Sequence, residues 1–550
     1  MPLDKGLILM SFNLLRDALF PVVTRSGRRR WVSLAQLAVI DGAEAPVAFD
    51  WPRADFNIAA CELAVGLTLL LFRPQSHDGW RGLWDNPPSP EEVERDAQAF
   101  VHAFDLLGDG PRFMQDLEAF DGEPIPVEAL LIDTPGANGQ KKNADLLTWR
   151  GRYPALGLPA AAMALYALQQ FAPAGGAGNR TSMRGGGPLT TLVTLDEASG
   201  EPAPLWRVIL ANLPLLGEGV TAASLPRALP WLAPTILSDA ANGGRTVSAA
   251  DPGVHELQAF FGQPRRIRLV GDGEGVCAMT GAPGKIVTGF VQKAWGVNYG
   301  VWRHPLTPYR RQKEDGEPYS AKPKSGHFGY RDWVAAVYGA AGGDLAETSE
   351  ILKLADRRAA AFETSRVQPA LMVGGWAMNN MEAIAYLHAL KPLYLGAEPQ
   401  LARDMALFAG SFSEVGELAH RVLRMALRKA HFSDGATVAT DRGLFEQARS
   451  AFFERTEGAF HVHVHDAFAQ GRPERRVSGP AWLRCLRDCA AALFTELTPD
   501  IAADPETGRR VASAWNDLQS SFAGYGKLGA AMFDRLDLPA PETKRKTRKA

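Results

Sequence analysis

The spacing of hydrophobic residues changes along the chain and divides it into two parts. In roughly the first two-thirds, short apolar runs alternate with glycine- and proline-rich connections, as in strands joined by turns. We expect strands at residues 192–195, 206–210, 266–270 and 286–290. This pattern predicts an irregular α+β body.

The second part begins near Asn379, where segments rich in Ala, Leu, Glu and Arg take on helical periodicity. Breaks separate these segments near Pro392, Gly435, 471–480 and 498–505. Helices with such short connections bury their apolar stripes by packing as an antiparallel bundle. We therefore predict an α+β fold with an irregular mixed N-terminal domain, residues 1–385, followed by a C-terminal antiparallel four-helix bundle, residues 386–538.

The ends of the chain predict no membrane segment. Residues 539–550 finish in the basic run KRKTRK and predict a disordered basic tail. The apolar stretch 6–12 is flanked by charges and lacks a following small-residue cleavage site, so we expect no signal peptide. The longest clean apolar run, 63–72, has about half of the roughly 20 residues that a membrane-spanning helix needs.

The charge composition limits how the protein can bind nucleic acid. The formal net charge is -2 over 550 residues, so any contact with phosphate has to come from local patches. The chain has 4 cysteines and no CxxC pair, which favours a reducing, cytoplasmic location over a disulfide-bonded, secreted one.

The most informative segment is glycine-rich. Residues 175–193 read GGAGNRTSMRGGGPLTTLV, and their backbone can approach another chain closely while Asn179, Arg180 and Arg184 present polar groups. The segment lacks the Lys-Ser/Thr ending of a P-loop and the strand-to-helix frame of a dinucleotide fingerprint. From the residues alone, a flexible loop and a nucleic-acid-binding loop both remain open.

Further segments accompany this loop in a recognisable order. They are FNLLRDALFPVV (12–23), RFMQD (112–116), DTPGANGQKKNAD (133–145), RGGGPLTT (184–191), TGFVQKAWGVNYGVWRHPLTPY (288–309) and GGWAMNNMEA (374–383). Together they resemble the CasA family, the large subunit of the type I-E CRISPR surveillance complex Cascade, over nearly the whole chain.

The resemblance implies a non-catalytic DNA-binding subunit without a cofactor. Such a subunit reads the protospacer-adjacent motif of double-stranded target DNA from the minor groove, where the base code is degenerate and readout is permissive. It joins the crRNA-bearing Cascade subunits, promotes strand separation and R-loop formation, and recruits a helicase-nuclease. The residues that match the family's flank-reading positions are Ala174, Gly175, Gly176, Ala177, Gly178 and Lys293. Two family glycines are alanines here, at positions 174 and 177, so we expect a different set of tolerated flanks.

Two other family elements carry over. The strand-separating wedge corresponds to Asn380 and Met381; the usual glutamine is absent, and Met381 stands nearest to its place. A methionine that only fills a gap in the core is the alternative. The loop that contacts the crRNA 5′ end and neighbouring subunits corresponds to Leu131, Ile132 and Asp133, where a plain mobile surface loop is the alternative.

Two clusters in the C-terminal part stand outside the resemblance. Arg421, Arg424 and Arg428 are spaced to share one helix face, where they would hold the displaced single strand or a neighbouring subunit, or simply be solvated. The other cluster is His461, His463 and His465. On a strand these three could ligate zinc, but the helical character of the flanking sequence spreads them around a helix.

Motifs for catalysis are absent from the sequence. It has no Gly-x-Ser-x-Gly elbow, HExxH pair or Walker motif, and Cys277 lacks the partners of the structural zinc site found in some CasA relatives. We therefore predict no enzyme activity and no metal. Two rival hypotheses are a metal-dependent enzyme that uses residues 461–465, and a scaffold subunit of another RNA-guided complex that does not recognise a flank.

Overall fold

The computed structural model describes residues 12–142, 145, 148–176, 178–271, 273–339, 345–432, 443–498 and 504–541. The chain forms two compact units. Unit 1 comprises Met1–Ser325 and Ser349–Leu393, and unit 2 comprises Gly326–Thr348 and Tyr394–Ala550. The predicted basic tail lies mostly outside the described residues.

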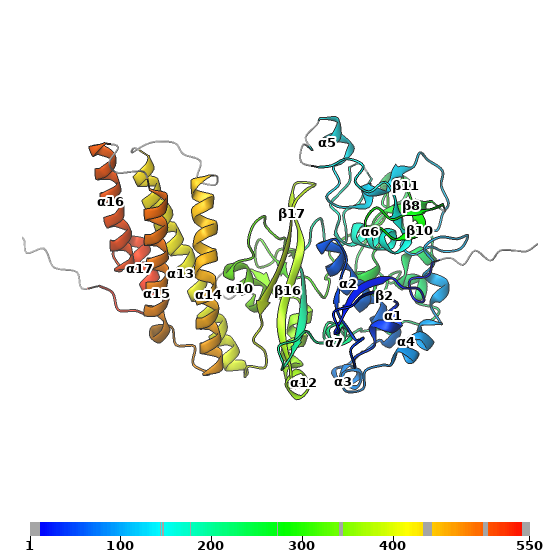
Figure 1. Cartoon of the computed structure of the whole chain (residues 1–550), viewed down its shortest axis with the longest axis horizontal. Helices are drawn as coiled ribbons and strands as arrows, with labels where there is room; N and C mark the ends of the chain where they lie inside the picture. Colours follow the sequence, from blue (N-terminus) through cyan, green and yellow to red (C-terminus); the bar gives the residue numbers. More distant parts are fainter. Residues whose placement is uncertain are drawn as a thin grey trace, which may run out of the picture. The chain divides into compact units, whose positions relative to one another are not determined.

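Helix α2 (Ala54–Phe72) forms the centre of unit 1. Its apolar side chains lie all around the helix, so nearly every residue is buried. Helices α6 (Leu158–Phe171) and α7 (Leu205–Ala211) pack against it (Figure 1). Among the described residues, α2 is the one helix long and apolar enough to cross a membrane, and 89% of its most apolar stretch is buried inside the protein, as in the core helix of a globular domain.

The longest strands of unit 1 form a three-stranded antiparallel sheet in the order β17-β16-β6, which Figure 1 shows as a long hairpin with a third strand beside it. The strands are β6 (Thr190–Glu197), β16 (Val367–Asn379) and β17 (Glu382–Pro392). Two glycines of β16 are required by close packing. A Cβ at Gly375 would lie 2.5 Å from the Pro188 carbonyl oxygen, and one at Gly374 would lie 2.8 Å from Cγ1 of Ile58 in α2.

Smaller sheets position the loops of unit 1. The sheet β4-β11-β8 is antiparallel and ends with Lys293 opposite Arg266. Its strands are β4 (Ile125–Pro126), β8 (Arg266–Val270) and β11 (Gly289–Lys293). The other strands are β1 (Phe20–Thr24), β2 (Arg29–Val32), β3 (Pro46–Phe49), β5 (Leu156–Gly157), β7 (Thr246–Val247), β9 (Glu274–Val276), β10 (Pro283–Val287), β12 (Asn298–Tyr299), β13 (Tyr309–Arg310) and β14 (Tyr319–Ser320).

Unit 1 also contains short helices. They are α1 (Leu34–Leu37), α3 (His77–Asp85), α4 (Pro90–Ala97), α5 (Ala137–Lys141), α8 (Leu225–Ala228), α9 (Gln258–Phe261), α11 (Glu350–Arg357) and α12 (Ala359–Thr364). Both α3 and α4 begin with a serine cap, Ser76 and Ser89, whose hydroxyl accepts from a backbone N–H of the first turn.

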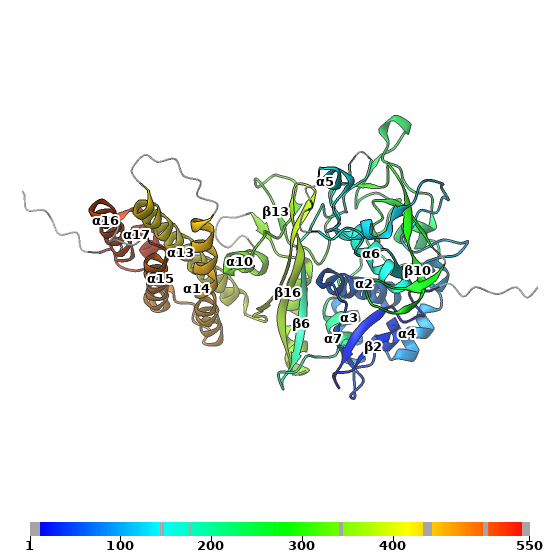
Figure 2. The same cartoon turned by 45° about the horizontal axis from the view of Figure 1, so that its top comes forward.

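Unit 2 is helical. Its long helices are α13 (Pro399–His431), α14 (Leu444–Ala469), α15 (Arg475–Leu497) and α16 (Pro505–Phe522), followed by the shorter α17 (Gly526–Arg535). Figure 2 shows these helices side by side, and α13 packs against each of the others. The unit also contains α10 (Tyr330–Tyr338) and β15 (Ala346–Glu347). Aromatic rings fill its core, where Trp482 stacks on Phe412 and donates its indole N–H to the Phe412 carbonyl at 3.0 Å.

The predicted fold class, a mixed N-terminal part followed by a helical C-terminal part, is confirmed. Three details differ. Residues 206–210 form helix α7 and not a strand, because a short run that is apolar on every side suits a buried helix as well as a buried strand. The helical texture expected from Asn379 begins only at Pro399, after β17. The boundary expected at residue 385 therefore falls inside a hairpin, and the units divide at Leu393.

Candidate nucleic-acid interface

The glycine loop is a tight turn that hydrogen bonds between residues 175, 176 and 179 close, and its Gly178 is buried. The Gly175 amide donates to the Asn179 carbonyl at 3.0 Å, and the Asn179 amide donates to the Gly176 carbonyl at 3.2 Å. Gly176 and Gly178 have φ angles of 94° and 78°, which side chains other than glycine rarely adopt. Ala174, Gly175 and Gly176 are exposed, whereas Ala177 lies outside the described residues.

The end of this loop is fixed to the residues that follow β11. The Trp295 amide donates to the Gly178 carbonyl at 2.7 Å. A Cβ at Gly178 would lie 2.5 Å from the Cβ of Ala294, so only glycine allows this approach. The Gln292 side chain also donates to Oδ1 of Asn179 at 2.5 Å. Lys293, the residue between these contacts, is thereby held beside the loop.

Lys293 is half-exposed and already has partners. Its Nζ lies 4.9 Å from the ring centroid of Phe120 and 3.4 Å from Oε1 of Glu118. Hydrogen bonds from Arg266, and secondly the contact with Lys293, lower the pKa of the exposed Glu118 carboxyl. Since exposed ion pairs contribute little stability, the ammonium group can exchange Glu118 for another partner at small cost.

The arginines of the glycine-rich segment point inward. Arg180 donates to the side chain and carbonyl of Ser238, at 2.7 and 3.0 Å, and its guanidinium lies 5.2 Å from the centroid of the Trp295 ring. Beneath the loop, Arg265 donates to the carbonyls of Pro173 and Arg180. Burial lowers the pKa of Arg265 to about 10. These guanidinium groups therefore support the loop.

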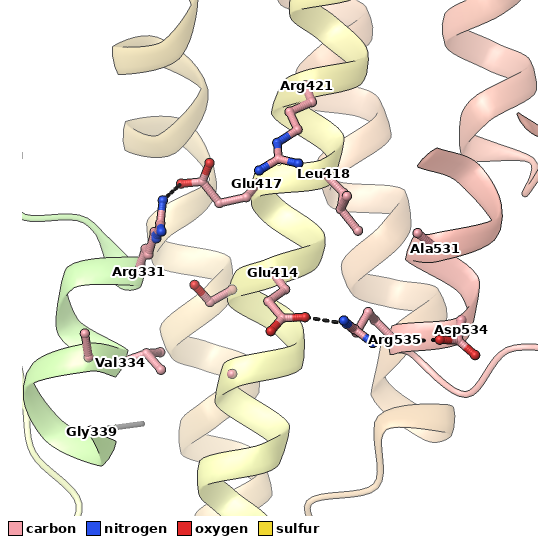
Figure 3. A pocket seen from close by; sticks show the side chains of 13 residues that line it. Arg331, Val334, Gly339, Glu414, Glu417, Leu418, Arg421, Ala531, Asp534 and Arg535 are labelled. Carbon is pink, nitrogen blue, oxygen red and sulfur yellow. Dashed lines mark hydrogen bonds and ion pairs between the residues drawn. The ribbon is translucent and has the colours of Figure 1, made fainter. Parts of the chain in front are cut away.

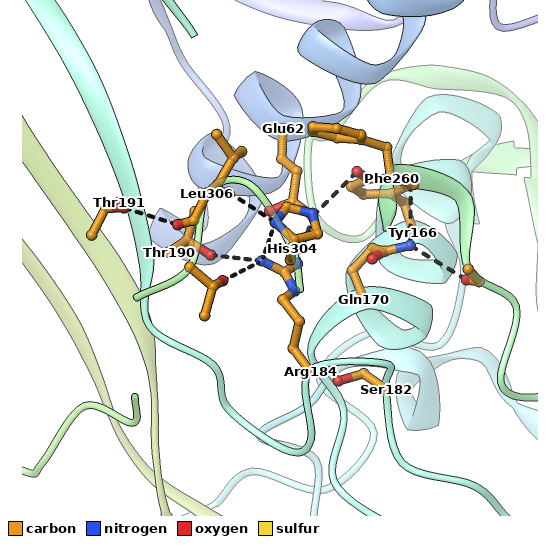
Figure 4. A network of polar contacts seen from close by, with 12 residues as sticks. Glu62, Tyr166, Gln170, Ser182, Arg184, Thr190, Thr191, Phe260, His304 and Leu306 are labelled. Atoms are coloured by element: carbon orange, nitrogen blue, oxygen red, sulfur yellow. Dashed lines mark hydrogen bonds and ion pairs between the residues drawn. The ribbon is translucent and has the colours of Figure 1, made fainter. Parts of the chain in front are cut away.

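Arg184 is the base of the same segment and is fully buried. It donates to Oε1 of Glu62 in α2 at 2.6 Å, and both side chains have 0% exposure (Figure 4). A second nitrogen of Arg184 reaches the hydroxyls of Thr190 and Thr307 at 3.3 and 3.2 Å. Burial, reinforced by Arg184, lowers the pKa of the neighbouring His304 well below its ordinary value. The expectation that Arg184 is presented to another chain is therefore wrong, because its guanidinium group is buried in a salt bridge with Glu62.

The tip of the β16–β17 hairpin carries an exposed methionine. Asn380 has a φ of 55°, as a tight turn requires, and Met381 is 57% exposed. The alternative that Met381 fills a gap in the core is therefore wrong. On the same hairpin, Ile384 is 54% exposed.

The predicted crRNA loop and this hairpin border one hollow of about 320 Å³. Leu131 is buried, Ile132 is partly buried, and the exposed Asp133 accepts from Arg53 at 2.8 Å. The hollow is lined by residues of the loop and of the hairpin, among them Leu131, Asp133, Trp149, Arg150, Arg152, Tyr153, Trp376, Ala383 and Ile384. Trp149 is 78% exposed, and the motif comparison did not single it out.

In unit 2, the predicted arginine stripe lies on α13, with Arg421 and Arg428 exposed and Arg424 partly buried. His461, His463 and His465 lie on helix α14, so the favoured helical interpretation is confirmed and the strand arrangement that would hold zinc is not formed. Over the part of the chain that the structure describes, no group of three or more His, Cys, Asp or Glu side chains could hold a metal ion.

Comparison with known proteins agrees with the motif order. The sequence matches the family model of the CRISPR-associated protein Cse1 over residues 13–493. The fold is similar to that of CasA from Thermus thermophilus, with a TM-score of 0.68 and 18% identity over 93% of this chain and 99% of that one.

Two further structures are similar. Thermobifida fusca Cse1 has a TM-score of 0.64 and 19% identity, over 96% of this chain and 98% of its own. A chain of a CRISPR RNA-guided surveillance complex has a TM-score of 0.65 and 15% identity, over 92% of this chain and 99% of its own. The chain thus belongs to the Cse1 (CasA) family, the large subunits of type I-E Cascade, as its sequence motifs predict.

Proposed function

We propose that this subunit recognises the protospacer-adjacent motif of target DNA from the minor groove, through the glycine loop and Lys293. The observation that supports this most directly is the hydrogen bond from the Trp295 amide to the Gly178 carbonyl at 2.7 Å. It joins two segments that lie far apart in the sequence and that the family resemblance assigns, independently of each other, to the same task.

The geometry suits a shallow and sequence-tolerant contact. A Cβ built at Gly176 has no neighbour within 4 Å, so the backbone at this position faces open space and can approach a groove wall. Lys293 adds a flexible ammonium group beside it. Because the minor groove distinguishes mainly A·T from G·C pairs, such a contact accepts several related flanks. Position 174 is alanine here and glycine in relatives. The methyl group of Ala174 limits how closely the DNA can approach one edge of the loop.

Strand separation is assigned to the hairpin tip in the same proposal. An exposed apolar side chain can insert beside a base step and offset part of the unstacking cost of a few kcal/mol. Met381 has the exposure that this role needs. Guide RNA pairing then reads the sequence of the opened strand.

Most of the remaining roles follow the family. Leu131, Ile132 and Asp133 belong to a loop that contacts the crRNA 5′ end and neighbouring subunits. The stripe of Arg421, Arg424 and Arg428 stands outside the family resemblance; its spacing along one helix supports our proposal that it holds the displaced strand. After R-loop formation the subunit recruits a helicase-nuclease that cuts the DNA, so it needs no catalytic site of its own, and it works in the cytoplasm.

The test is target binding by the reconstituted complex, with and without a correct flank. Lys293→Gln is expected to weaken binding to the flanked target by roughly fivefold, about 1 kcal/mol, and to leave binding to unflanked DNA nearly unchanged. The matched control is Lys353→Gln, which removes an exposed lysine of α11.

A second pair of variants tests the loop. Gly176→Asn is expected to reduce flanked binding, because its side chain enters the space that the groove wall would occupy. Gly27→Asn is the control, since Gly27 also has a positive φ and open surroundings, in the turn between β1 and β2. Equal affinity of the Gly176 and Lys293 variants and the wild type for flanked DNA would reject flank recognition by this site. Wild-type binding that ignores the flank would favour the scaffold hypothesis.

A further inference from the structure

Two hollows lie end to end in unit 2 between α13 and α17. The first, of about 350 Å³, is bordered by α10, α13 and α17, as Figure 3 shows. The second, of about 550 Å³, is bordered by α13, α16 and α17. We call the pair the α13–α17 groove.

The lining residues show that the two hollows are consecutive. Along α13 the first hollow runs from Gly410 to Arg421, and the second continues from Val422 past Lys429 to Phe432, just after the helix. Along α17 the order reverses, from Arg535 in the first hollow to Gly526 in the second. At 1.5 Å per helical residue, the groove is roughly 30 Å long. That length suits an extended polymer better than a small molecule.

The groove has an excess of positive charge. Six cationic side chains line it, namely Arg331, Arg421, Arg428, Lys429, Lys527 and Arg535. The acidic side chains that line it are Glu414, Glu417, Asp517 and Asp534.

Every one of these carboxylates has a cationic partner. Glu417 lies 3.6 Å from both Arg331 and Arg449, Glu414 pairs with Arg535, and Asp517 lies 2.6 Å from Lys429. Asp534 lies 3.8 Å from Arg535. Arg421 and Lys527, in contrast, make no ion pair with any residue that the structure describes. Two cations are therefore left to receive anionic groups of a ligand.

One buried side chain supports an anionic ligand in the first hollow. Ser413 is 4% exposed and lines the hollow, and its hydroxyl has no hydrogen-bond partner among the residues described. A phosphate oxygen would satisfy it.

The floor of the second hollow is apolar. Val422, Leu518 and Leu528 line it, and Met425 is 61% exposed there with Lys527 at the rim. Proteins that bind single strands combine cations that follow the backbone with side chains, aromatic ones above all, that pack against the bases. Polyglutamate, which has no apolar side chains, would use the cations but would leave this floor exposed.

We propose that the α13–α17 groove binds single-stranded DNA, with phosphate groups on Arg421 and Lys527 and bases against Met425. The proposal deepens the strand-holding role given to the arginine stripe, and so rests on the proposed function. It adds Lys527, Ser413 and the apolar floor, which lie on or beside the groove and outside that stripe. Unlike flank recognition, it requires neither guide RNA nor partner subunits, so the two can fail separately.

The test uses the isolated full-length chain and a fluorescein-labelled oligothymidylate, with binding followed by anisotropy at several salt concentrations. Each phosphate contact to a single strand contributes about 0.7 to the slope of log K against log salt. Arg421→Gln with Lys527→Gln is therefore expected to reduce the slope by about 1.4 and to weaken binding by roughly tenfold at 0.1 M salt.

The matched control is Arg484→Gln with Arg509→Gln, which removes two exposed arginines of α15 and α16 that line neither hollow. Met425→Asp places a carboxylate on the floor and is expected to weaken binding without a change in net cation number. The proposal is overturned if both double variants lose the same affinity, or if polyglutamate of equal length displaces the oligonucleotide as well as unlabelled oligothymidylate does. Normal strand binding with lost flank discrimination would instead reject only the role of the glycine loop.

Discussion

Gly178 and Gly176 offer a matched pair of substitutions that tests how the flank-reading loop is held. Both residues have a positive φ, 78° and 94°. They differ in their surroundings, because a Cβ at Gly178 would lie 2.5 Å from the Cβ of Ala294, whereas one at Gly176 meets nothing within 4 Å. Gly178→Ala must therefore push the loop away from the end of β11, and Gly176→Ala need not.

The expected magnitude follows from these contacts. Alanine in a left-handed conformation costs about 1–2 kcal/mol, and this term is common to both variants. Gly178→Ala additionally stretches or breaks the 2.7 Å hydrogen bond between the Trp295 amide and the Gly178 carbonyl. A lost hydrogen bond contributes about 0.5–1.5 kcal/mol, and leaving the partner unsatisfied about 1–3 kcal/mol. The difference between the variants should thus be about 1–3 kcal/mol.

Hydrogen exchange of the Trp295 amide is the direct assay. Gly178→Ala should lower the protection of this amide at least about fivefold more than Gly176→Ala does, which corresponds to the difference of about 1–3 kcal/mol. Urea unfolding of both variants reports how much of the cost reaches global stability. Equal protection of the Trp295 amide in the two variants would refute the view that the Gly178 contact holds the loop.

Three further predictions concern other parts of the molecule. Arg184→Met leaves Glu62 buried without its partner and should lower the free energy of unfolding in urea by about 3–5 kcal/mol; a loss below about 1 kcal/mol would contradict the buried pair. Met381→Ala should change stability by less than about 0.5 kcal/mol but slow strand opening, followed by 2-aminopurine fluorescence beside the flank, and an unchanged rate would remove Met381 from that step. Burial lowers the pKa of His420 to about 4 in the folded protein, against about 6.5 in the unfolded chain. Between these pH values the folded state binds fewer protons, so the free energy of unfolding should fall as the pH drops from about 6.5 to about 4. His420→Asn should flatten that part of the pH profile, and an unaltered profile would place its cause elsewhere.

The elements that the sequence predicts best are those in which hydrophobic residues recur with a regular spacing. The helices of unit 2 carry long periodic stripes between clear breaks, and their existence was predicted from the sequence. Short apolar runs predict the type of element less well, since residues 206–210 form the helix α7 and not a strand. The hairpin of β16 and β17 was missed as a hairpin because alanine and leucine in β17 resemble helical composition, while its pairing with β16 is a tertiary contact.

In the candidate site, too, local motifs identify the residues, but the contacts between them depend on the tertiary fold. The glycine loop and Lys293 were found by motif, but their hydrogen-bonded contact depends on a register between β11 and the loop that no local pattern encodes. Arg184 looked available because its neighbours are glycines, yet its partner Glu62 lies on α2, far away in the sequence. Lys527 was not singled out either, since its significance comes only from the groove that α13 and α17 form together.

Photocrosslinking from position 293 tests the central claim most directly. A photoreactive side chain replaces Lys293 in the reconstituted complex bound to a flanked target, and the same group at position 353 on α11 serves as the control. Flank recognition by this site predicts crosslinks from position 293 to nucleotides of the protospacer-adjacent motif and none from position 353. An absence of DNA crosslinks from position 293, in a complex that still discriminates flanked from unflanked targets, would contradict it.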